Sequence, residues 1–217
     1  FTLVLMTGPD LPEPYLSQLR ELTEIAPQFR LSLVEPMAEH IEACRAATIP
    51  HIDPDADVVG HFRQDDDDAV AVNYIECARS DFAMLRDLWQ LRRRLYCDYS
   101  RGLVLKATQD GVTVEPRIIH HAVAAMTVYL APDAGHSVVD FPHWKISMAM
   151  PGVIMAEQIM YARVLNHDND SGAIGAGYPL KSRLNPGGAL ARRFRIDLPT
   201  LEEGARGFGL PGAPRPN

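Results

Sequence analysis

The first 62 residues alternate between strand-like and helix-like segments, and this alternation restricts the fold more than any other feature of the sequence. Residues 1–7 form a continuous apolar run that ends in a Gly-Pro-Asp turn, as a buried parallel strand does. Helical and strand-like patterns then alternate over residues 16–25, 29–34, 37–44 and 58–62. Strands that alternate with helices imply a parallel sheet with right-handed crossovers. We therefore predict an α/β fold with a mixed, mostly parallel central sheet flanked by helices.

The second half of the chain has a different pattern of helix-like and strand-like segments. Residues 72–95 show a mainly helical pattern, whose apolar stripe consists of Met84, Leu88, Leu91 and Leu95. Strand-like segments separated by turns follow at residues 102–105, 112–114 and 122–130. This part predicts a mixed or antiparallel extension of the sheet.

Size and composition favour one domain. A chain of 217 residues that is 47% hydrophobic can bury one substantial core. After residue 186, several glycines and prolines occur with little periodicity, and the last residues carry too little apolar surface to order themselves. We expect a single domain over residues 1–186 and an extended, loosely held Gly/Pro-rich tail over residues 187–217.

Charge and cysteine content exclude several classes of protein. The formal net charge of -7 argues against a nucleic-acid partner, because binding the phosphate backbone normally requires a cationic face. The three cysteines lie far apart without metal-site spacing, which favours a reduced, cytoplasmic location. No stretch approaches the roughly 18 consecutive apolar residues of a membrane helix. Arg92, Arg93 and Arg94 leave open a weak peripheral contact with an anionic membrane.

The most informative segment is the run of four aspartates, Asp65 to Asp68, that follows the strand-like residues 58–62. Adjacent carboxylates repel one another, so the fold is destabilised unless cations, hydrogen-bond donors or solvent neutralise them. Ligands of open α/β sheets bind beyond the carboxyl ends of the strands, where this run is expected. Oxygen ligands suit Mg²⁺ or Mn²⁺, which complete their coordination with water and substrate phosphates. The run therefore predicts a site for a divalent cation and a nucleoside diphosphate.

The residues around this run resemble a known family. The segment FRQDDDDA at residues 62–69 resembles the signature F-R-L-D-D-D-D-A of the bacterial "putative rhamnosyltransferase" family, relatives of the GT-A glycosyltransferases with an Asp-x-Asp motif. Further similarity lies at residues 7–15, 101–105, 140–143 and 166–171. The resemblance implies a GT-A-like fold and the transfer of a sugar from a nucleoside-diphosphate sugar to an unknown acceptor.

The resemblance also implies roles for individual residues. Asp65 and Asp67 form the Asp-x-Asp pair, with Asp67 the stronger candidate for the metal ligand and Asp65 nearer the ribose or diphosphate. The supporting candidates for binding the nucleotide sugar are Arg63, Asp66 and Asp68. Related enzymes commonly add a metal-binding histidine from a late loop, and His167 is the candidate here. The alternative for His167 is an exposed turn residue.

Two features depart from the family pattern. Such folds open with a strand whose following loop holds the nucleotide base, whereas residues 1–7 resemble the second strand. The first strand is therefore expected either to be absent, which would weaken nucleotide binding, or to precede residue 1. Gln64 replaces a hydrophobic residue of the signature, which affects local packing rather than the carboxylates.

The catalytic base is left open by the sequence. An inverting enzyme needs a carboxylate or histidine near the acceptor hydroxyl. The candidates are Asp140, His143, Asp168 and Asp170. Trp144, beside His143, is either ordinary core packing or part of a wall that stacks on the acceptor sugar. The adjacent histidines at residues 120 and 121 indicate no zinc site, because neighbouring strand residues point to opposite faces.

These patterns together predict a glycosyltransferase-like protein that depends on Mn²⁺ or Mg²⁺. Two alternatives share the same carboxylates: a catalytically inactive nucleotide-sugar-binding protein of the same fold, and a metal-dependent phosphohydrolase. The structural alternative is a solvated acidic loop that neutralises the N-terminus of a following helix.

Overall fold

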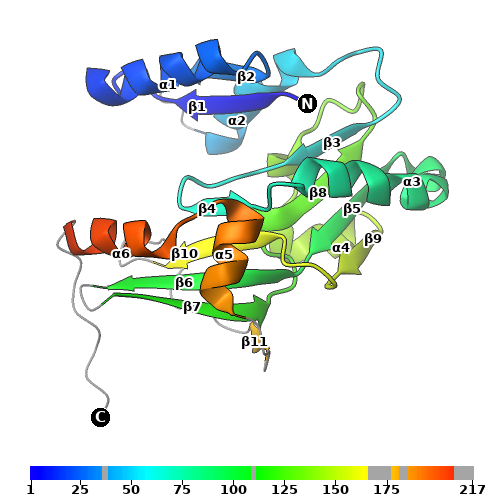
Figure 1. The fold of residues 1–217 in the computed structure, drawn as a ribbon. Helices are drawn as coiled ribbons and strands as arrows, with labels where there is room; N and C mark the ends of the chain where they lie inside the picture. The colour runs from blue at the N-terminus through cyan, green and yellow to red at the C-terminus, as the bar shows by residue number, and fades with distance from the viewer. Residues whose placement is uncertain (36–38, 109–110, 166–176, 181–184, 208–217) are drawn as a thin grey trace.

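The computed structural model describes residues 1–35, 39–108, 111–165, 177–180 and 185–207, and these fold into three β-sheets with helices packed against them (Figure 1). The sheets contain two, five and four strands. A mixed α/β architecture is therefore confirmed.

The first sheet follows the predicted order of elements. Strands β1 (Leu3–Thr7) and β2 (Phe29–Leu33) pair in parallel, and helix α1 (Glu13–Ile25) connects them. Two prolines at the start of α1 suit a helix N-terminus, where a missing backbone N–H costs nothing. Helix α2 (His40–Thr48) and the short 3₁₀-helix η1 (Ile49–His51) follow. This two-stranded sheet lies at one end of the molecule, beside β3 (Figure 1).

The four-stranded sheet lies at the centre of the fold. Its strand order is β3 (Val59–Phe62), β8 (Met126–Leu130), β5 (Arg94–Tyr99) and β9 (Gly152–Met155). The β3–β8 and β8–β5 pairings are antiparallel, and β5 pairs in parallel with β9. Both faces are covered, because alternate residues of β5 and β8 belong to different core clusters.

Helix α3 (Tyr74–Arg92) packs on one face of this sheet, where Phe82 and Trp89 join Leu95 of β5 in the core. The other face is covered by residues of two short helical segments, η3 (Val138–Asp140) and α4 (Ile146–Ala149), and the 3₁₀-helix η4 (His143–Lys145) leads into α4. Another short 3₁₀-helix, η2 (Val123–Ala125), leads into β8.

The five-stranded sheet carries the C-terminal helices. Its strand order is β11 (Tyr178–Pro179), β7 (Gly111–Ile118), β6 (Arg101–Thr108), β10 (Tyr161–Leu165) and β4 (Asp68–Val70). Only the β6–β10 pairing is parallel among these described strands. Helices α5 (Pro186–Phe194) and α6 (Leu198–Gly207) lie across this sheet (Figure 1).

The prediction of a mostly parallel central sheet is wrong. Three of the eight pairings among the described strands are parallel, and β3 pairs antiparallel with β8 instead of joining β1 and β2. A strand pattern predicts that a segment is extended, but not which distant segment becomes its partner.

The predicted long helix ends earlier than its apolar pattern indicated. Arg93 adopts a left-handed conformation with φ 56°, which stops α3, and its guanidinium lies 4.3 Å from the Trp89 ring centroid. Leu95 belongs instead to β5, where it is fully buried. Met84 and Leu91 of the predicted stripe are 70% and 77% exposed.

The expectation of an extended tail is wrong for residues 187–207, which form most of α5 and α6. Asn185 caps α5 by accepting a hydrogen bond from the Gly188 N–H at 3.0 Å, and Pro186 occupies the first turn. Leu190 and Phe194 are buried against the sheets. Residues 208–217 lie outside the described residues.

Candidate functional site

The acidic run connects two different sheets. It begins after β3 of the four-stranded sheet, and its last member, Asp68, is the first residue of β4 at the edge of the five-stranded sheet. The predicted position at the end of a strand is confirmed. The following element is a strand rather than a helix, so neutralisation of an adjacent helix N-terminus does not account for these carboxylates.

Backbone hydrogen bonds fix the shape of this acidic turn, residues 65–68. The Asp68 N–H donates to the Asp65 carbonyl oxygen at 3.2 Å, which closes the turn. The Val164 N–H of β10 donates to the Asp67 carbonyl oxygen, also at 3.2 Å. The main chain of the turn is therefore tied to the five-stranded sheet before any ligand is considered.

Arg63 and Asp65 form an ion pair at the entrance to the turn. The Nε and Nη2 atoms of Arg63 both lie 2.8 Å from Asp65 Oδ1. Their side chains are 42% and 35% exposed, so the pair is partly solvated. Between them Gln64 has both side-chain polar atoms buried, without a hydrogen-bond partner in the described part of the chain.

Asp68 is the most buried carboxylate of the run, with a side chain only 2% exposed. Its neighbour across the β4–β10 ladder is Arg163, whose Nε lies 3.9 Å from Asp68 Oδ1. Within the described ranges, Asp68 Oδ1 accepts no hydrogen bond. Burial raises the pKa of Asp68 to about 7; Arg163 opposes this rise, and the charges of Asp67 and Asp65 add to it.

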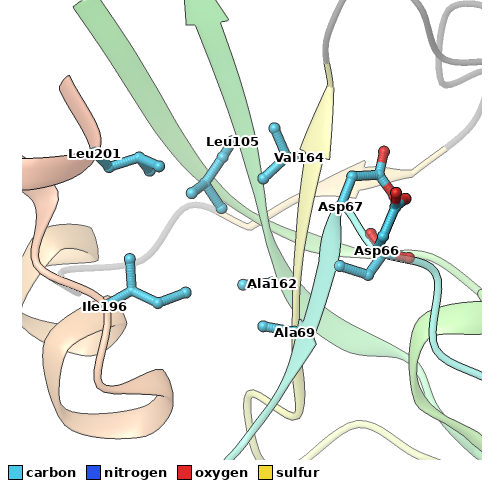
Figure 2. Close-up of a pocket in the computed structure, with 9 residues that line it drawn as sticks. Asp66, Asp67, Ala69, Leu105, Ala162, Val164, Ile196 and Leu201 are labelled. Atoms are coloured by element: carbon cyan, nitrogen blue, oxygen red, sulfur yellow. The ribbon is translucent and has the colours of Figure 1, made fainter. Parts of the chain in front are cut away.

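A pocket of about 240 Å³ lies beside the acidic turn. Three aspartates, Asp66, Asp67 and Asp68, are among the residues that line it, and the rest of its lining is apolar. Figure 2 shows Ile196 and Leu201, from the C-terminal part of the chain, pointing toward Leu105 and Ala162 of the five-stranded sheet. The segment predicted to be a loose tail therefore closes one side of this pocket.

The remaining predicted residues separate into three groups. Asp140 has a structural role, because it pairs with Arg45 of α2 and accepts the Ser137 N–H at 2.7 Å in a capping box.

His143 lies within electrostatic range of charged residues at the acidic turn. Burial lowers its pKa, the charges of Arg63 and Arg163 lower it further, and Asp65 opposes them. The predicted metal ligand His167 and the base candidates Asp168 and Asp170 lie outside the described residues.

Trp144 does not pack in the core, since it is 66% exposed. The structural interpretation of this residue is therefore wrong. Its ring meets the His143 ring edge to face, with centroids 4.8 Å apart and planes at 88°. An exposed aromatic surface therefore lies next to His143, whose pKa is affected by the charges of Arg63 and Asp65.

Sequence reasoning missed two charged residues, the partly buried Arg163 and the buried Asp98. Arg163 is the single charged residue of strand β10, and that isolation was the sequence signal that could have identified it.

Asp98 is fully buried at the end of β5, where it accepts the His121 N–H at 2.7 Å. Burial raises the pKa of Asp98 to about 7. The His121 ring in turn forms a hydrogen bond with the Tyr96 hydroxyl at 3.1 Å.

The described residues contain no preassembled metal cage, defined as three or more His, Cys, Asp or Glu side chains placed to hold an ion. The chemistry of the acidic turn nonetheless suits Mg²⁺ or Mn²⁺, which need only one or two carboxylates when substrate phosphates supply the other ligands. The buried Asp68 oxygen without a donor is consistent with a polar or cationic group at this position.

The fold and site define a mixed α/β protein with an acidic turn between two sheets. The chain belongs to the family described as "Putative rhamnosyl transferase", whose model matches residues 1–178. This membership supports a glycosyltransferase, with a sugar donor and an acceptor as its partners. Comparisons with curated proteins and with solved structures gave no match. Among the described helices, none is long and apolar enough to cross a membrane.

Proposed function

We propose that this protein is a GT-A-like glycosyltransferase in which the acidic turn binds a divalent cation and the diphosphate of a nucleotide sugar. Asp67 and Asp65 are the proposed metal ligands among the described residues, and His167, which lies outside them, is the proposed third ligand. Arg63, Asp66 and Asp68 are the proposed contacts to the nucleotide sugar. The family description names rhamnose, and we take an activated deoxyhexose as the first donor class to test.

One observation supports this proposal above the others: three consecutive aspartates of the acidic turn line one pocket, and Oδ1 of the most buried of them, Asp68, accepts no hydrogen bond from a described residue. Arg63 and Arg163 pair with Asp65 and Asp68, and a bound cation would offset the remaining repulsion among the carboxylates. A merely solvated loop would not bury Asp68 or fasten its backbone to β10. When bound, the cation would neutralise the diphosphate and the charge that develops on it as it leaves.

His143 is the best described candidate for the base of an inverting transfer. Its lowered pKa leaves the imidazole neutral near pH 7 and able to accept a proton. In the proposed step, the acceptor hydroxyl oxygen bonds to the anomeric carbon and its proton moves to His143. The bond from that carbon to the phosphate oxygen breaks, and the nucleoside diphosphate leaves with the electron pair. Asp140 is unsuited to this role because its carboxylate is already paired.

The test is a calorimetric titration of Mn²⁺ and nucleoside diphosphates into the wild type and Asp67→Asn. We expect Asp67→Asn to weaken both affinities at least about tenfold, because a ligand that binds a dication loses its charge. Asp133→Asn, which neutralises an exposed carboxylate outside the acidic turn, is the matched control and should leave both affinities unchanged. Equal affinity in the wild type and Asp67→Asn would disprove the site.

Turnover assays separate the transferase from its two alternatives. A glycosyltransferase releases nucleoside diphosphate from a nucleotide sugar faster when its acceptor is present. Nucleotide binding without any turnover identifies an inactive binding protein. Release of inorganic phosphate from simple phosphate esters, lost in Asp67→Asn, identifies a phosphohydrolase.

A further inference from the structure

The segment after η3 presents two large apolar side chains to solvent. Trp144 of η4 is 66% exposed and Met148 of α4 is 84% exposed. The same segment is firmly anchored, because Ile146 and Met150 are buried against Tyr96 in the core cluster beneath it. The exposed indole is therefore held on a fixed support and is not part of a loose loop.

The position of Trp144 connects it to the acidic turn. Its neighbour His143 lies within electrostatic reach of Arg63, Arg163 and Asp65. The rings of His143 and Trp144 meet edge to face, so the indole lies next to the residue that interacts with these charges. The indole thus lies beside the candidate base, whose electrostatic partners include residues at the acidic turn.

The chemistry of this border fits a sugar better than a larger partner. A flat aromatic face packs against the apolar C–H face of a sugar ring, and nearby charged groups bind its hydroxyls. A membrane-binding helix needs a long amphipathic face, whereas α4 has four residues. A stable protein interface buries about 800 Å² on each partner, far more than two side chains provide.

We propose that the exposed indole of Trp144 stacks on the acceptor sugar and that the acceptor is a carbohydrate. This inference rests on the proposed glycosyltransferase function and adds the acceptor class to it.

Saturation-transfer NMR on the full chain tests the inference with methyl glycosides of common hexoses and 6-deoxyhexoses as probes. We expect Trp144→Ala to reduce the apparent affinity about three- to tenfold, the loss expected for one aromatic contact. Trp144→Phe should retain most of the affinity because it keeps an aromatic face. Met84→Ala, which removes another exposed apolar side chain from α3 on the opposite face of the sheet, should have no effect.

Two results would overturn the inference. One is equal glycoside binding by the wild type and Trp144→Ala. The other is absence of glycoside binding together with Trp144-dependent sedimentation on vesicles of phosphatidylcholine and phosphatidylglycerol at 3:1, which would assign the indole to a lipid surface. Calorimetric titration of Mn²⁺ and nucleoside diphosphate into the same variants separates this inference from the proposed function. Trp144→Ala should leave those affinities unchanged, whereas Asp67→Asn should reduce them and retain glycoside binding.

Discussion

Asp68 and Arg163 face each other across the antiparallel ladder between β4 and β10, with 3.9 Å between Asp68 Oδ1 and Arg163 Nε. Their side chains are 2% and 19% exposed. The ladder register therefore places the most buried carboxylate of the acidic turn beside a cation from a strand far away in the sequence.

Arg163→Met should destabilise the fold by about 1–3 kcal/mol at pH 8, because it leaves the Asp68 charge buried without its cation. Arg163 has further interactions, which its replacement also removes. Adding Asp68→Asn to Arg163→Met removes the uncompensated carboxylate charge, and the stability that this recovers is the part of the loss due to the Asp68–Arg163 pair. Urea unfolding measures each free energy. Arg117→Met breaks the more exposed Arg117–Glu115 pair and should cost less than about 1 kcal/mol. Equal costs at both sites would contradict a special role for Arg163.

Asp98 should make the unfolding free energy depend on pH. Its folded pKa of about 7 lies above the ordinary value of 3.8, so the folded state binds the proton more tightly. Its contribution to stability is present below pH 4 and is lost as the pH rises toward 7. Asp98→Asn removes this dependence while retaining an oxygen that accepts the His121 N–H. Relative to the wild type, its unfolding free energy should rise on the order of 3–4 kcal/mol between pH 4 and pH 8.

Urea unfolding at several pH values measures this difference for Asp98→Asn. The exposed residue Asp133 provides the control, since Asp133→Asn removes a carboxylate that pays no burial cost. A constant difference between the wild type and Asp98→Asn across the pH range would show that Asp98 is not responsible.

Gly102→Ala should destabilise the fold by about 1–3 kcal/mol through overpacking. A Cβ at residue 102 would lie 2.3 Å from the Tyr161 ring, and this ring is fully buried, so it has little room to move. Gly204→Ala is the matched control, because a Cβ there meets no atom within 4 Å in α6. It should stabilise the protein by about 0.5–1 kcal/mol through helix propensity. Thermal and urea unfolding of both variants give the comparison, and a neutral Gly102→Ala would contradict the ring packing.

Leu190→Ala tests whether α5 is an integral part of the fold. Leu190 is fully buried, so we expect a loss of about 2–5 kcal/mol in unfolding free energy. Leu91→Ala removes the same side chain from a position that is 77% exposed and should change stability by less than about 0.5 kcal/mol. If the two variants unfold alike, the C-terminal helices do not contribute to the core.

The first 48 residues were predictable because their signals are local. The apolar run of β1, the prolines at the start of α1 and the alternating pattern of β2 each act within a few residues. The pairing of β3 with β8 depends on contacts between distant segments, which no local pattern contains. Helix α5 was missed because its two glycines weaken helix propensity, whereas the Asn185 cap and the burial of Leu190 compensate for them.

The candidate site was predictable only in part. The position of the aspartates after a strand followed from sequence, and their role as ligands stays a prediction. Arg163 reaches Asp68 only through the ladder register, and Asp98 belongs to a strand that the sequence assigned partly to a helix. The exposure of Trp144 likewise depends on which of its neighbours fill the core, and here those are Ile146 and Met150.

The acidic turn is one of the covalent links between the four-stranded and five-stranded sheets, beside the single-residue link at Ser100 between β5 and β6. A rigid-body shift of one sheet against the other would therefore change the backbone between Phe62 and Asp68, and with it the spacing of the carboxylates. The distances among these carboxylate oxygens therefore depend on how the two sheets are aligned. A ligand that fixes those distances would at the same time restrain that alignment.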